Sequence, residues 1–294
     1  MTTAPDRLLL RLEWKVIRRL DGRIQGGNRT LHRGTGMDLA GVRPYVDGDD
    51  ARHIDWNVTA RLDELQVREF TEDRELTSWL VLDRSASMAV GAPGRDKHDV
   101  LNELALVLAR LFGRGGNRVG AVLYDTGSVQ IIRPATGRRQ ALLIGAELQR
   151  GGDPQHGATT DLAAMLDTVA SIAKRRSLVV VLSDFIGTGG WERPLMRLAH
   201  RHEVVALRIV DAADEGLPSV GLILVEDAET GEQVLVDSSD PMFRSRFADG
   251  IDERDAALVD GMKHAGVPLH RVDTSADLVS TVIGIVAETR RRRA

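Results

Sequence analysis

The 294-residue chain contains no cysteine. Disulfide bonds, thiolate nucleophiles and cysteine-ligated zinc are therefore excluded, and the absence fits a reducing compartment. The chain also lacks an excess of either charge. Its formal net charge is −4, so no overall basic field attracts nucleic acid or an anionic membrane. A hydrophobic content of 43% and a charged content of 28% are ordinary for a globular protein of one large or two modest domains.

Long hydrophobic runs are also missing. The most apolar stretch near the N-terminus, residues 1–22, is interrupted by charges from Arg11 onward, well short of the length that spans a bilayer. Its apolar residues fall near one face of a helix, at Leu8, Leu12, Ile17 and Leu20. We therefore expect an amphipathic helix that packs on a core, no membrane anchor and a cytoplasmic location.

The motifs of several enzyme classes are absent. A serine hydrolase of the α/β type needs Gly-x-Ser-x-Gly, but Asp83 and Ser87 flank Ser85. Haloacid-dehalogenase-like phosphotransferases need Asp-x-Asp, and Ser85 occupies the second position. A phosphate-binding loop is excluded at residues 91–98, because Asp96 precedes Lys97 and would repel a phosphate. We find no positioned general base or second metal site, and we expect that the protein is not an enzyme.

Apolar strands and amphipathic helices alternate from residue 65 onward. The predicted strands are 65–70, 76–83, 118–125, 128–134, 177–184, 203–211, 220–227, 232–237 and 267–273. The predicted helices are 99–113, 138–150, 159–175, 191–201, 250–265 and 275–293. Such alternation predicts an α/β fold, namely an open, mostly parallel sheet with helices on both faces.

Polar side chains follow the apolar run 76–83 at alternate positions. Asp83 ends this predicted strand, and Ser85 and Ser87 follow it. Alternation places the three side chains on one side while the chain is extended, and the loop beyond lets them surround one point. One carboxylate and two hydroxyls are hard oxygen ligands of the kind that Mg²⁺ prefers. The pattern indicates a candidate Mg²⁺ site, and the alternative is an ordinary turn.

Two further oxygen side chains are available. Thr160 stands where a loop leads into a predicted helix, and Asp184 ends the apolar strand 177–184. Taken singly, Thr160 is typical of a helix N-cap and Asp184 of a turn after a strand. In open parallel sheets, however, ligands bind at the C-terminal ends of the strands. If the strands that end at Asp83 and Asp184 are neighbours, their carboxylates meet at one edge.

The segments DRSAS, GATTDL and VVLSD resemble, in order and spacing, the metal-ion-dependent adhesion site of von Willebrand factor A domains. The resemblance implies a von Willebrand factor A-like (Rossmann-like) fold whose metal ligands are Asp83, Ser85, Ser87, Thr160 and Asp184. It also implies Mg²⁺, Mn²⁺ or Ca²⁺ as the ion, with one coordination position left for a carboxylate of a partner protein.

The tract VRPYVDGDDARHIDWNVTARLDELQVREF, residues 42–70, resembles the signature of the bacterial family known as domain of unknown function 58. The resemblance implies a signature segment, residues 1–74, that packs on a main domain, residues 75–294. Within the tract, an EF-hand is excluded because its glycine and glutamate positions are not met. We expect instead a turn whose carboxylates pair with Arg43, Arg52 and Arg61, while Trp56 packs inward.

Members of that family are often encoded beside MoxR-type AAA+ ATPases, which implies an adaptor or cofactor role in chaperone-like assembly. We therefore predict a metal-dependent protein-interaction module. Its partner would be a MoxR-type AAA+ ATPase or a carboxylate-bearing client, with no role for nucleic acid or membrane. Two alternatives stay open, namely a metal-dependent hydrolase that uses Asp83 and Asp184, and a scaffold that has lost its metal.

Overall fold

The computed structural model describes residues 37–72, 76–92, 95–125, 128–150, 160–216, 218–227 and 231–291. The chain divides into two compact units between Glu75 and Leu76. The amphipathic helix predicted near the N-terminus lies outside the described residues, and the packing of residues 1–74 on the main domain stays a prediction.

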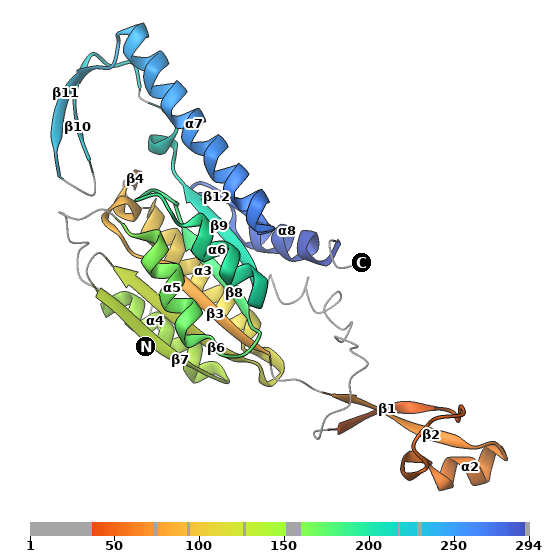
Figure 1. Cartoon of the computed structure of the whole chain (residues 1–294). Helices are drawn as coiled ribbons and strands as arrows, with labels where there is room; N and C mark the ends of the chain where they lie inside the picture. Colours follow the sequence, from red (N-terminus) through yellow and green to blue (C-terminus); the bar gives the residue numbers. More distant parts are fainter. Residues whose placement is uncertain are drawn as a thin grey trace. The chain divides into compact units, whose positions relative to one another are not determined.

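The smaller unit is an antiparallel pair of strands with helical turns between them (Figure 1). The strands are β1 (Met37–Pro44) and β2 (Gln66–Glu72), and the turns are η1 (Ala51–His53) and α2 (Trp56–Leu62). Asp55 begins α2, because its carboxylate accepts hydrogen bonds from the backbone N–H groups of Asn57 and Val58. The aspartate-rich tract is therefore mainly a set of backbone caps and turns.

The carboxylates of this tract pair with arginines of the two strands. Arg43 donates hydrogen bonds of 2.7 Å to both carboxylate oxygens of Asp49. Arg68 Nε lies 2.9 Å from Asp55 Oδ2. Hydrogen bonding from Arg68 is the main reason why the pKa of Asp55 lies below its ordinary value. The arginine pairing was correctly predicted for Arg43, and Arg68 takes the role expected of the other two arginines.

Two expectations about this tract are wrong. Within the described residues, neither Arg52 nor Arg61 forms an ion pair with a carboxylate. Trp56 does not pack inward but is 66% exposed. The reason is local, since the capping role of Asp55 makes Trp56 the first residue of a short helix whose side chains the two-stranded sheet does not cover.

The larger unit contains a six-stranded sheet of order β12-β9-β8-β3-β6-β7 (Figure 1). All neighbours are parallel except β6 and β7, which form an antiparallel hairpin at one edge. The strands are β3 (Thr77–Asp83), β6 (Arg118–Asp125), β7 (Ser128–Ala135), β8 (Leu178–Ser183), β9 (Glu203–Val210) and β12 (Leu269–Asp273). The predicted fold class, an α/β protein with an open and mostly parallel sheet, is confirmed.

Helices cover both faces of this sheet, and each side has its own apolar core. One core contains residues of α3 (Lys97–Phe112), α4 (Arg138–Arg150) and α8 (Leu278–Arg291). The other contains residues of α5 (Leu162–Ile172), α6 (Glu192–Arg201) and α7 (Pro241–Ala265). Short elements complete the unit: η2 (Ala86–Ala89), β4 (Gly91–Ala92), β5 (Arg95–Asp96), η3 (Arg114–Gly116) and η4 (Ala212–Asp214).

The helix predicted over 250–265 begins nine residues earlier, at Pro241. Asp240 accepts a hydrogen bond from the N–H of Met242, and Pro241 fits the first helical position because it has no N–H to satisfy. The stretch also carries Phe243 and Phe247 four residues apart, an apolar pair at helical spacing that the predicted range omits. The preceding hairpin, β10 (Leu222–Glu226) with β11 (Gln233–Asp237), forms as predicted and lies with the first turns of α7 beyond the sheet (Figure 1).

Replacing Gly120 by alanine should lower the free energy of unfolding by about 1–3 kcal/mol. A methyl group there would lie 2.9 Å from both Trp79 Cε3 and Pro134 Cγ, which overpacks the strand face. Urea denaturation measures the change. Gly189→Ala is the matched control, because that position faces open space. An equal loss of stability in the two variants would contradict the packing argument.

His202 should make the fold sensitive to acid. It is 4% exposed, and neither ring nitrogen has a hydrogen-bond partner among the described residues. Burial, and then the charge of Arg201, lower the pKa of His202 below its ordinary value. The fold therefore favours the neutral ring, and stability falls as the pH drops below about 6.5, where the unfolded chain takes up the proton.

We expect His202→Leu to lose less stability than the wild type between about pH 7.5 and about pH 5.5. Unfolding by urea at both pH values measures this. His200→Leu, a change at an exposed position on the same helix, should behave as the wild type does. Parallel losses in all three proteins would show that His202 is not the acid-sensitive group.

Candidate metal centre

Two acidic strand ends lie next to one another in the sheet. β3 and β8 are parallel neighbours, and the pairing of Leu82 with Leu182 places Asp83 level with Ser183. The Ser183 hydroxyl donates a 2.6 Å hydrogen bond to Asp83 Oδ2, and Asp184 follows at the same edge. Both carboxylates are buried, since Asp83 is 0% and Asp184 is 2% exposed. The two strands are thus neighbours, which is the condition under which Asp83 and Asp184 meet at one edge.

The two serines after Asp83 turn back toward it. The N–H of Ser85 donates to Asp83 Oδ1 at 3.0 Å, and the Oγ atoms of Ser85 and Ser87 lie 3.1 Å apart. Both serines are buried. The chain beyond β3 thus folds into η2 around three oxygen-bearing side chains, as the alternating pattern leads one to expect.

Thr160 is buried and packs on the loop that follows β8. Its carbonyl oxygen accepts a 2.9 Å hydrogen bond from the N–H of Thr188. Gly187 has a φ of 155°, and any Cβ there would run into the Thr160 carbonyl, so only glycine permits this approach. The N-cap of α5 is Asp161, which accepts from the N–H of Ala164, so the capping alternative for Thr160 is wrong.

Tyr124 shows that the Thr160 segment and the Asp83 corner are near one another. Burial is the main reason why the pKa of Tyr124 is raised, followed by the charges of Asp161 and Asp83. Asp83 and Tyr124 are also paired residues of β3 and β6. The structure thus brings Asp83, Ser85 and Ser87 into one cluster, with Asp184 and Thr160 on segments beside it.

A buried lysine reaches this cluster. Lys97, the first residue of α3, is 0% exposed, and its Nζ lies 2.8 Å from Asp184 Oδ2 and 3.0 Å from Asp214 Oδ1. Burial disfavours its charge, but the two carboxylates outweigh burial and raise the pKa of Lys97. The other oxygen of Asp184 accepts from the N–H of Ile186 at 3.0 Å. Asp184 is therefore both a turn residue and the partner of an internal cation.

Sequence reasoning missed Lys97, Asp214 and Ser183 as parts of this site. In the sequence, Lys97 was considered only as the lysine of a phosphate-binding loop, which was excluded. A lysine that directly follows the aspartate opening an apolar helix carries no signal of burial, and Asp214 lies 117 residues further along the chain. Ser183 had a weak signal, because it is the last strand residue beside a predicted ligand.

The cluster carries more negative than positive charge. Burial, and then the neighbouring charge of Asp184, raise the pKa of Asp83 to about 7. Lys97 neutralises one of the three carboxylates Asp83, Asp184 and Asp214 when all are ionised. No group of three or more acidic or histidine side chains suited to a metal occurs in the described part of the chain. A cation here would therefore depend on hydroxyl oxygens and water as well as carboxylates, which fits a hard divalent ion.

Comparison with known proteins identifies relatives of uncharacterized role. A family model described as protein of unknown function DUF58 matches residues 41–257. An uncharacterized protein of Mycobacterium tuberculosis is 35% identical over 280 residues, which cover 95% of this chain and 88% of the relative. A shorter uncharacterized protein of Mycobacterium avium is 32% identical over 137 residues, or 46% of this chain and 79% of that protein.

Two solved structures are similar at low identity. The conserved hypothetical protein BatB of Bacteroides thetaiotaomicron has a TM-score of 0.46 at 13% identity, covering 74% of this chain and 99% of BatB. The VWA domain of SpRpn10 has a TM-score of 0.40 at 12% identity, covering 71% of this chain and 94% of that domain. The fold assignment therefore rests on the strand order of the sheet and not on these TM-scores. None of the helices among the described residues is long and apolar enough to cross a membrane.

Proposed function

The chain belongs to the DUF58 family of unknown function, and we propose that it is a protein-interaction module that binds its partner through a divalent metal ion. The observation that carries the proposal is the buried cluster of Asp83, Ser85 and Ser87 beside Asp184. It stands at the C-terminal edge of a parallel sheet, where such folds place ligands.

The chemistry of the cluster supports Mg²⁺ or a similar hard ion, Mn²⁺ or Ca²⁺. Two hydroxyls and a carboxylate converge, and the surplus of negative charge favours a cation. When bound, the ion would supply a Lewis-acidic position for a carboxylate of another protein. The residues that would hold it are Asp83, Ser85 and Ser87, with Thr160 and Asp184 on the adjoining segments.

The partner that we propose is a MoxR-type AAA+ ATPase or a client protein that offers a carboxylate. The ATPase is suggested by the gene neighbourhood of the family, and the carboxylate by the chemistry of the site. A metal-dependent hydrolase that uses Asp83 and Asp184 is less well supported, because hydrolysis needs a positioned general base or a second metal ion and the sequence offers neither. Asp184 Oδ2 also accepts a hydrogen bond from Lys97 Nζ. The same contact with Lys97 favours a second candidate, a scaffold that uses an internal ammonium in place of the metal.

Co-purification with the MoxR-type ATPase of the same genome tests the proposal. We expect the wild type to recover at least about tenfold less ATPase in EDTA than in Mg²⁺. A metal contribution of about 1.4 kcal/mol to the binding free energy changes the affinity by this factor. Ser85→Ala, which removes one buried hydroxyl, should recover little in either buffer. Ser171→Ala, at an exposed position, is the matched control. Equal recovery in Mg²⁺ and EDTA would contradict metal-mediated binding.

A further inference from the structure

A groove of about 640 Å³ opens at the end of the sheet opposite the candidate metal centre. Thr77 and Arg118, which line it, are the first residues of β3 and β6, whereas the metal centre follows the last residue of β3. Thr77 and Asp83 are six positions apart along β3, or about 20 Å of extended chain, and Trp79 is four positions, or about 13 Å, from Asp83. The groove is therefore a separate feature that the proposed function does not use.

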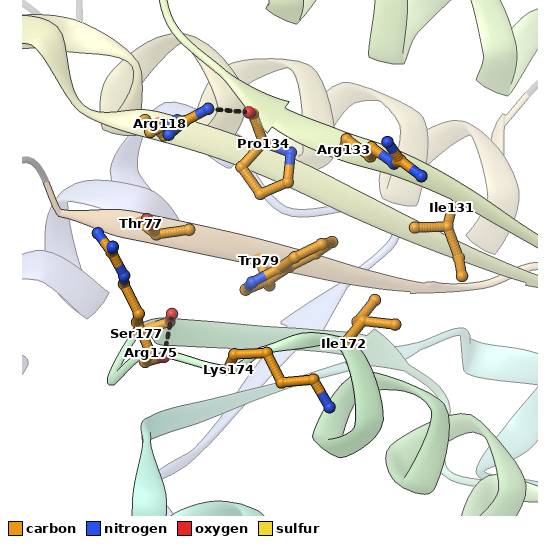
Figure 2. A pocket seen from close by; sticks show the side chains of 10 residues that line it. All are labelled: Thr77, Trp79, Arg118, Ile131, Arg133, Pro134, Ile172, Lys174, Arg175 and Ser177. Atoms are coloured by element: carbon orange, nitrogen blue, oxygen red, sulfur yellow. Dashed lines mark hydrogen bonds between the residues drawn. The ribbon is translucent and has the colours of Figure 1, made fainter.

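The floor of the groove is apolar. It is made by Trp79, Ile131, Pro134 and Ile172, and Figure 2 shows Trp79 between the β7 residues and the end of α5. Trp79 can lie flat on the sheet because its neighbour in β6 is Gly120, which has no side chain. Ile132 packs into the core under α4, but the adjacent Ile131 points to the other face and stays 44% exposed. Trp79 itself is only 5% exposed, so the apolar surface open to solvent here belongs mainly to Ile131, with an edge of the indole beside it.

Cations surround that floor. Arg118 and Arg133 lie on one side of Trp79, and Lys174 and Arg175 on the other (Figure 2). None of the described residues that line the groove carries a carboxylate. Arg118 donates to the carbonyl of Pro134 at 3.2 Å, which orients its guanidinium. Like-charged groups that gather without a counter-charge create a local positive potential that attracts an anion.

We propose that this groove binds a small amphipathic anion, a molecule with a flat apolar body and at least two negative charges. The apolar body would cover Ile131 and the exposed edge of Trp79, and the negative groups would pair with the arginines and the lysine at the rim. The groove has the volume of an ordinary small-molecule site. A compact inorganic anion would leave the apolar floor uncovered, and a neutral apolar molecule would leave the four cations unpaired.

The probe is 1-naphthyl phosphate, which has a flat body and two negative charges. Its binding is followed by NMR through the indole N–H signal of Trp79, one of four tryptophans, assigned with Trp79→Phe. We expect a saturable shift of this signal. The double variant Arg133→Glu/Lys174→Glu should bind about tenfold more weakly, because two exposed pairings become repulsions. Arg244→Glu/Arg246→Glu, with the same change of charge on exposed positions of α7, should bind as the wild type does.

Two fragments of the probe separate the sources of binding. Inorganic phosphate carries the charge alone and 1-naphthol carries the body alone, and each should bind at least about tenfold more weakly than the whole probe. No saturable shift of Trp79 with 1-naphthyl phosphate would overturn the proposal. Phosphate or naphthol binding as tightly as the probe would also overturn it, as would equal weakening in the two charge-reversed variants. Circular dichroism confirms that each variant is folded before titration.

Discussion

Replacing Lys97 by methionine should lower the free energy of unfolding by about 3–5 kcal/mol, the cost of leaving a buried charge without its partner. The ammonium group is wholly buried and pairs with Asp184 and Asp214, so its loss leaves the buried carboxylate of Asp184 and the partly buried carboxylate of Asp214 without that cation. Methionine keeps most of the side-chain volume, so the effect reports charge more than packing. Urea denaturation in EDTA measures the change without interference from metal ions.

Two further variants make the Lys97 result specific. Lys174→Met removes an exposed lysine from the same unit and should change stability by less than about 0.5 kcal/mol. The triple variant Lys97→Met/Asp184→Asn/Asp214→Asn should recover a large part of the loss, because it removes the carboxylates that were left uncompensated. If Lys97→Met were as stable as the wild type, the ammonium would not be the counter-charge of this site.

Asp83→Asn should be more stable than the wild type without metal and less stable than the wild type with metal bound. Without metal, Asp83 is a buried carboxylate beside Asp184, so a neutral amide should raise the free energy of unfolding by about 1–2 kcal/mol. With Mn²⁺ at about a hundred times its dissociation constant, the wild type should gain about 2.7 kcal/mol, and the variant should gain nothing. Thermal unfolding in EDTA and in MnCl₂ measures both effects.

The control for Asp83 is Asp167→Asn, the same chemical change at an exposed carboxylate that pairs with Arg197. This variant should respond to Mn²⁺ as the wild type does. A wild type that Mn²⁺ does not stabilise would favour the metal-free scaffold, in which Lys97 supplies the counter-charge of Asp184 and Asp214. If the Asp83→Asn variant were stabilised by Mn²⁺ as much as the wild type, the metal would have to bind at another site.

The strands of the sheet were predicted correctly where a continuous apolar run marks a buried strand. The run 76–83 contains four consecutive apolar residues, 79–82, and it forms β3, buried almost throughout. The predicted strands 118–125 and 128–134 form an antiparallel pair, which makes β7 the edge strand of the sheet. The prediction failed at the start of α7, where Asp240 and Pro241 are a stronger signal than periodicity, and at Trp56, where a helix cap determined the exposure of an aromatic side chain.

The candidate site was predicted in part for the same reason. Asp83, Ser85 and Ser87 are neighbours in the chain, so alternation and a strand end suffice to group them. The adjacency of Asp184 required only that β3 and β8 pair, which strand order in such folds favours. The choice between Thr160 and Asp161 as the cap of α5 required the structure, because either residue type fits that position.

The sequence by itself determined the alternation of strands and helices and the acidic strand ends, because each depends on residues a few positions apart. Its composition, which lacks cysteine, excluded thiol chemistry. Tertiary structure decided that Lys97 is buried between Asp184 and Asp214, and that Trp79 lies under a rim of four cations. Those arrangements join segments that are far apart along the chain. Their energies arise from desolvation and from charges brought close only when the chain is folded, which no local pattern records.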